Sequence, residues 1–221
     1  MPDRSLSSPL PMAKSHTRAS VLALGSVALL WTGKAIPSVP THVTDVAAAG
    51  HLILLSVWLG VLARVEWTGE GSPFRGWKTL YLPLGLGLGV AAFVVAGLGY
   101  AVSDRVLRLT APAEAGLLVG FGARFFLLAG IALSAAVIEE WVLRGVVLSR
   151  LQAARPRGAV LLSSLVFAAY HLSLFQALPT FLLGVVLAAA VVRFQSLWPA
   201  VVAHVAFNLV GLLLTAVAAG S

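Results

Sequence analysis

The sequence predicts an all-α fold, a polytopic membrane bundle of about seven to eight transmembrane helices. Hydrophobic residues make up 59% of the 221-residue chain, charged residues make up only 10%, and the mean hydropathy is +0.97. A soluble domain is typically about 45–50% apolar and about 25% charged, so it could not bury this much apolar surface. The low charge also excludes a disordered chain, and the 21 glycines follow no three-residue collagen period.

Crossing a bilayer takes about 20 mostly apolar residues. Charged or Pro/Gly-rich breaks separate seven such stretches, namely 19–33, 46–64, 79–102, 115–150, 158–175, 177–193 and 198–219. The stretch 115–150 is too long for one simple crossing, so we expect it to run on as a helix at the inner face. LGLGLG at 84–89 lies inside an apolar run with no strand before it, which favours a helix-packing segment over a nucleotide-binding loop.

These stretches divide the chain into three parts. Residues 1–18 are polar and predict a disordered tail. Residues 19–114 predict N-terminal transmembrane helices with no assigned role, beginning with a retained helix rather than a signal peptide because no clear A-x-A site follows. Residues 115–219 predict a helical core that contains the candidate site.

Positive charge is distributed unevenly between alternate loops. With the N-terminus inside, ten Lys and Arg residues fall in inner loops and three, Lys34, Arg105 and Arg108, fall in outer loops. Cytoplasmic loops of multi-span proteins carry an excess of Lys and Arg. The distribution therefore predicts a cytoplasmic N-terminus. It also explains the net charge of +7 by the loops of a membrane protein, so we expect the lipid bilayer as partner and no nucleic acid.

Several polar side chains interrupt the apolar stretches. A charge at bilayer depth costs at least about 2.5–3.5 kcal/mol, so each of these residues is a functional hypothesis. They are Glu139, Glu140 and Arg144 in IEEWVLR, His171 in FAAYH, and His204 and Asn208 in HVAFN. Counted from the predicted inner ends of their helices, Glu139, His171 and His204 all lie roughly 9–20 Å deep. The similar depth predicts one buried polar site.

Helical spacing separates the roles of the two adjacent glutamates. On an α-helix Glu140 and Arg144 lie about 40° apart, in the order that favours an ion pair. Glu139 lies roughly 140° from Arg144 and faces elsewhere, so it must meet another helix, water or a proton. Glu139 is therefore a candidate general base or acid, and Arg144 has its charge partner in Glu140.

Two further pairs share a helix face at a spacing of four residues. Phe167 can brace His171, and His204 and Asn208 can present donors or ligands to one small volume. In one reading Glu139 and His171 polarise a water, and His204 and Asn208 donate to an oxyanion. In the other, Glu139, His171 and His204 hold a divalent metal such as zinc. Spacing alone leaves both readings open.

Known catalytic motifs narrow the choice by their absence. The chain has no cysteine, which excludes thiolate chemistry, and it lacks the HExxH, GxSxG and Walker motifs. The ordered set EExxxR (Glu139, Glu140, Arg144), FxxxH (Phe167, His171) and HxxxN (His204, Asn208) resembles the CPBP family, which comprises CAAX proteases and bacteriocin-processing Abi proteins. The resemblance covers about residues 115–215.

The resemblance implies a glutamate-dependent intramembrane endopeptidase that needs no cofactor. Glu139 would be the base acting with His171, and His204 and Asn208 would form the oxyanion hole. Glu140 and Arg144 would hold the shape of the site. The small size suggests a bacterial inner-membrane protein, so we expect a membrane-anchored protein or peptide as substrate. The alternatives are a proton- or ion-coupled transporter, against which no inverted repeat is found, and a non-catalytic scaffold or immunity protein.

Overall fold

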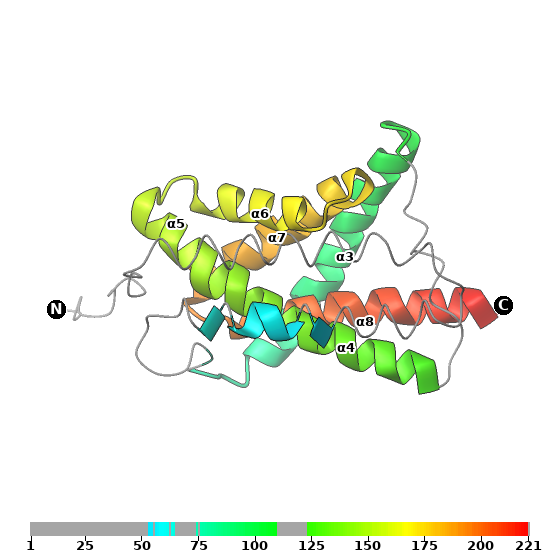
Figure 1. The fold of residues 1–221 in the computed structure, drawn as a ribbon, viewed down its shortest axis with the longest axis horizontal. Helices are drawn as coiled ribbons and strands as arrows, with labels where there is room; N and C mark the ends of the chain where they lie inside the picture. Colours follow the sequence, from blue (N-terminus) through cyan, green and yellow to red (C-terminus); the bar gives the residue numbers. More distant parts are fainter. Residues whose placement is uncertain are drawn as a thin grey trace.

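The computed structural model describes residues 53–54, 56–61, 63–64, 74, 76–109 and 123–220, and all regular secondary structure in them is helical (Figure 1). The all-α prediction is confirmed for these residues. The tail 1–18, the segment 19–33 and the first part of 46–64 lie outside the described residues.

The helices follow the predicted apolar stretches in order. Helix α3 spans Tyr81–Arg105, and α4 spans Ala123–Glu140. The chain runs on from α4 through a π-helical segment, η3 (Trp141–Leu148), into α5 (Ser149–Ala154). The last three helices are α6 (Ala159–Tyr170), α7 (Leu174–Phe194) and α8 (Trp198–Gly220).

The predicted number of seven to eight transmembrane helices is not confirmed. Within the described ranges, α3 and α7 are long and apolar enough to cross a membrane, while α6 and residues Trp198–Leu214 of α8 form shorter apolar helices. The predicted stretch 158–175 is also too long, because α6 ends at Tyr170 and His171 is its C-cap.

The stretch 115–150 departs from a regular α-helix at the candidate site. Residues Trp141–Leu148 form a π-helix, a geometry that is rare and is often found at functional sites. A π-helical turn holds more residues than the 3.6 of an α-helix, so each residue after Glu140 rotates by a smaller angle. The angle of roughly 140° expected between Glu139 and Arg144 therefore does not apply here. Most residues of η3 are buried, including Arg144.

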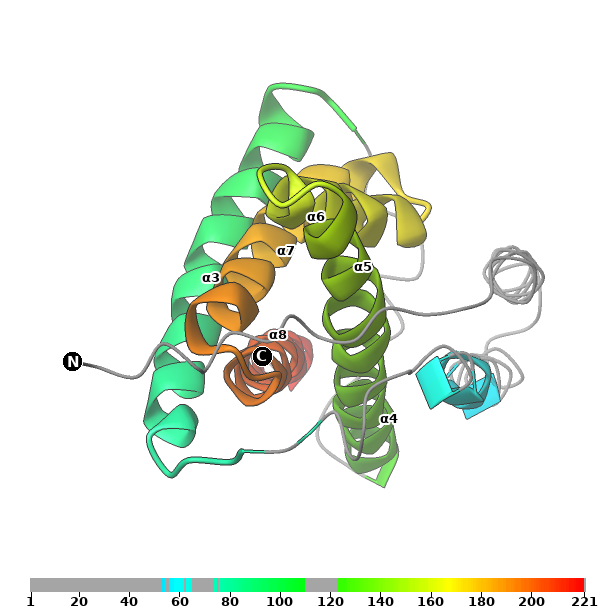
Figure 2. The same cartoon turned by 90° about the vertical axis from the view of Figure 1, so that its left-hand side faces the viewer.

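Helix α8 forms the centre of the bundle. It contacts α3, α4 and α7, and Figure 2 shows it almost end-on between α3 and α4. Helix α6 packs against α7 and η3. Phe167 near the end of α6 and Glu140 at the end of α4 both contact His204 in the first half of α8, so these three segments face one another.

Two glycines of the LGLGLG segment allow α3 and α8 to approach closely, which confirms that segment as a helix-packing element. A Cβ atom at Gly89 would lie 2.5 Å from the carbonyl oxygen of Ala203, and one at Gly85 would lie 2.5 Å from Cβ of Val202. Small residues at helix interfaces permit this spacing in membrane proteins.

We expect Gly89→Ala to lower the melting temperature in detergent, because the added methyl group meets backbone that cannot move aside. Overpacking of this kind costs about 1–3 kcal/mol. Gly87→Ala is the matched control, since a Cβ atom there meets nothing within 4 Å. Equal melting temperatures for the two variants would contradict the close packing of α3 on α8.

Candidate active site

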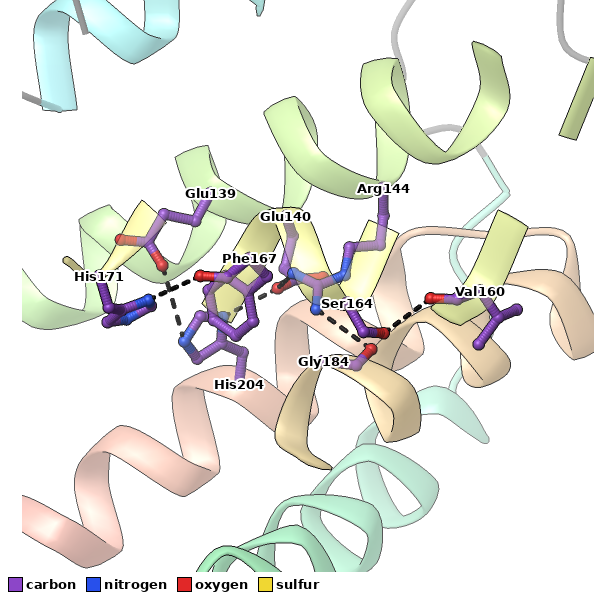
Figure 3. Close-up of polar contacts among 9 residues, drawn as sticks. All are labelled: Glu139, Glu140, Arg144, Val160, Ser164, Phe167, His171, Gly184 and His204. Carbon is purple, nitrogen blue, oxygen red and sulfur yellow. Dashed lines mark hydrogen bonds and ion pairs between the residues drawn. The ribbon is translucent and has the colours of Figure 1, made fainter. Parts of the chain in front are cut away.

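The polar residues singled out from the sequence come from three separate stretches of the chain, namely the continuous α4–η3 helix, α6 and α8. Glu139 and Glu140 end α4, Arg144 lies in η3, His171 caps α6, and His204 lies within α8. Figure 3 shows Glu139, His171 and His204 directed toward one region, with Glu140 and Arg144 beside them. The structure therefore brings these five residues close together, as their similar depth predicted.

Glu140 and Arg144 form the predicted ion pair. Nη1 of Arg144 donates to Oε1 of Glu140 at 2.8 Å, and both side chains are 0% exposed. Nη2 of Arg144 donates to the carbonyl oxygen of Gly184 at 3.3 Å. The guanidinium also lies 4.6 Å from the ring centre of Phe167, within the range of a cation–π interaction. The buried charge of Arg144 is thus stabilised by a carboxylate, a backbone carbonyl and an aromatic ring.

His204 lies between the two glutamates. Its Nδ1 is 2.9 Å from Oε1 of Glu140, and its Nε2 is 3.9 Å from Oε2 of Glu139. Of the three partners expected for Glu139, namely a group from another helix, water or a proton, the structure shows the first, which is His204. The Glu139 side chain is 16% exposed whereas Glu140 is fully buried, so Glu139 is the more accessible of the two carboxylates.

Phe167 packs against both histidines. Its ring centre lies 4.8 Å from that of His171 and 5.8 Å from that of His204, with both rings edge-on to it. Nδ1 of His171 lies 2.9 Å from the carbonyl oxygen of Phe167, and Tyr170 packs edge-on against the same imidazole. The predicted bracing of His171 by Phe167 is confirmed, and it extends to His204.

Asn208 is held against α4. Its Nδ2 donates to the carbonyl oxygen of Ala132 at 3.2 Å. This contact fastens α8 to α4 one helical turn from His204. A side-chain amide has two N–H groups, so one remains for another acceptor.

The metal alternative requires three ligands around one ion. Zinc binds nitrogen and oxygen ligands at about 2.0–2.2 Å, so its ligands must gather closely. In the part of the chain that the structure describes, no three His, Asp or Glu residues are grouped to hold a metal ion.

Two features of the site surroundings were missed from the sequence. Gly184 accepts from Arg144 through its backbone, and a Cβ atom at this glycine would lie 3.0 Å from Cβ of Ser164. An apolar cavity of about 490 Å³ also adjoins the α4–η3 junction; it is lined by Val57, Gly60, Val61, Arg64, Ile138 and Trp141. Neither feature could be predicted from the sequence, because a backbone carbonyl that accepts a hydrogen bond and a cavity between distant segments have no sequence motif.

A match to a known protein family includes all the residues of the candidate site. Residues 121–210 match the family model of the type II CAAX prenyl endopeptidase Rce1-like proteins. No curated protein matched the chain, and no solved structure matched it. The matched range contains all seven residues of the EExxxR, FxxxH and HxxxN motifs. Residues 121–210 thus match an Rce1-like domain, in agreement with the CPBP resemblance of the three motifs.

Proposed function

We propose that the chain is an intramembrane endopeptidase in which Glu139 acts as general base. The observation that carries this proposal is the division between the two glutamates. Glu140 is committed to Arg144 at 2.8 Å and is fully buried, whereas Glu139 is 16% exposed and faces Nε2 of His204 at 3.9 Å. A general base must keep its carboxylate available to a water molecule, and only Glu139 does so here.

The reaction begins when Glu139, acting with His171, accepts a proton from water. The water oxygen bonds to the carbonyl carbon of the scissile peptide, and the carbonyl oxygen becomes an oxyanion. The carbon–nitrogen bond then breaks, and the proton held by Glu139 passes to the leaving amine. Water is consumed and one carboxylate and one amine are formed, so no other reactant is needed.

In this mechanism Asn208 supplies a donor to the oxyanion, and His204 supplies a second one when its Nε2 carries a proton. They lie one turn apart on α8, which the contacts with α3, α4 and α7 hold in place. Donors fixed before the reaction stabilise developing charge better than donors that must reorient. The contact of Asn208 with Ala132 leaves it one N–H group for this purpose.

The substrate of this activity is a membrane-anchored protein or peptide. An Rce1-like domain implies a membrane-associated protein substrate, and the bundle presents an apolar surface to the bilayer. Along α3, large exposed side chains recur every four residues, namely Leu82, Leu86, Val90, Val94 and Leu98. We place the protein in a bacterial inner membrane with its N-terminus in the cytoplasm.

We expect Glu139→Gln to lower cleavage by about 10²–10⁴-fold while the protein stays folded, because glutamine keeps the shape and removes the base. The measurement compares protein termini by mass spectrometry in host cells that express the wild type or the variant at equal levels. Particular membrane proteins should keep an uncut segment only with the variant. If no terminus differs between the two strains, the transporter and scaffold alternatives replace the protease.

We expect cleavage to continue after treatment with a strong chelator, because the proposed mechanism has no step through a metal. Metal removal is verified by elemental analysis of the treated protein. Loss of cleavage that added zinc restores would overturn the glutamate mechanism and favour the metal alternative at Glu139, His171 and His204.

A further inference from the structure

The proton between Glu140 and His204 can be assigned from the contacts of the carboxylate. Oε1 of Glu140 lies 2.8 Å from Nη1 of Arg144 and 2.9 Å from Nδ1 of His204. Arginine keeps its charge in proteins, and a glutamate paired with it is ionised and accepts hydrogen bonds only. The proton in the second contact therefore belongs to Nδ1 of His204, which donates to Glu140.

His171 follows the same rule with a different acceptor. Its Nδ1 lies 2.9 Å from the carbonyl oxygen of Phe167, and a carbonyl oxygen accepts only. Nδ1 of His171 therefore also carries a proton. The hydrogen bond at one ring nitrogen of a histidine sets the role of the other, so each imidazole keeps Nε2 for exchange with other groups.

We propose that Glu140 is a positioning residue that fixes a proton on Nδ1 of His204 and thereby makes Nε2 its only exchanging nitrogen. Nε2 faces Glu139, with 3.9 Å between Nε2 and Oε2. Arg144 acts on His204 only indirectly, as the charge partner of Glu140. The catalytic meaning of this arrangement rests on the proposed function, whereas the position of the proton does not.

The assignment constrains how His204 takes part in the reaction. With a proton on Nδ1 only, Nε2 has a lone pair and can accept but cannot donate. Nε2 donates to an oxyanion only if the ring already holds a second proton from solvent as an imidazolium ion, because the proton taken from water goes to Glu139 and then to the leaving amine. In both states the Nδ1 proton stays with Glu140, so Glu140 determines which atom of His204 changes during the cycle.

Nitrogen NMR tests the assignment without any substrate. The full-length chain, labelled with ¹⁵N-histidine in detergent micelles, is titrated upward in pH and followed by two-bond proton–nitrogen correlation. The chain contains five histidines, and the His204 signals are those missing from His204→Asn. We expect Nε2 to lose its proton and Nδ1 to keep it. Loss of the proton from Nδ1 would overturn the proposal.

A pair of variants at adjacent glutamates tests the cause. In Glu140→Gln the acceptor-only carboxylate becomes an amide that can also donate, so we expect the Nδ1 resonance to shift toward its unprotonated value. Glu139→Gln is the matched control, because Glu139 faces Nε2 and its loss should leave the Nδ1 proton in place. An unchanged Nδ1 resonance in folded Glu140→Gln would show that Glu140 does not fix the proton.

The outcomes separate this proposal from the proposed function. The wild-type titration decides the proton position even if Glu140→Gln fails to fold. A proton fixed on Nδ1 in a protein without cleavage activity would uphold the positioning and reject the protease. Cleavage activity with a proton that moves off Nδ1 would do the reverse.

Discussion

One oxygen atom organises the candidate site. Oε1 of Glu140 accepts from Arg144 of η3 at 2.8 Å and from His204 of α8 at 2.9 Å, with both Glu140 and Arg144 fully buried. Removing one partner of a buried ion pair leaves an uncompensated charge in a region of low dielectric constant, at a cost of about 3–5 kcal/mol. The contact therefore joins the α4–η3 junction to α8 and sets the direction of the histidine ring.

The other contacts of the site reinforce this joint. Phe167 lies under the Arg144 guanidinium and against both imidazoles, and Gly184 brings the backbone of α7 within reach of Arg144. Four segments of the chain thus converge on one arginine and one ring. With Glu140 held in this way, its neighbour Glu139 remains partly exposed, which is the property that the proposed chemistry requires of a base.

The sequence predicted the site better than it predicted the backbone that builds it. Ion pairs and shared faces at a spacing of four residues depend on local helix geometry, so Glu140 with Arg144 and Phe167 with His171 were found from spacing alone. The π-helical turn at Trp141–Leu148 was missed, because an apolar run carries no mark of a change in helix type. His171 was expected within a helix and caps α6 instead. The contact of His204 with Glu140 links residues 64 positions apart, which no local rule predicts.

The most direct test separates the stabilising role of Glu140 from its positioning role. We expect Glu140→Gln alone to lower the melting temperature in detergent, since Arg144 loses its charge partner. A double variant, Glu140→Gln with Arg144→Met, removes both charges and should recover most of that loss, because a buried pair can be replaced by residues of similar volume. We expect that the folded double variant still fails to cleave the proteins identified by terminal mass spectrometry. Cleavage by that variant at the wild-type rate would contradict the central role of Glu140 in orienting His204.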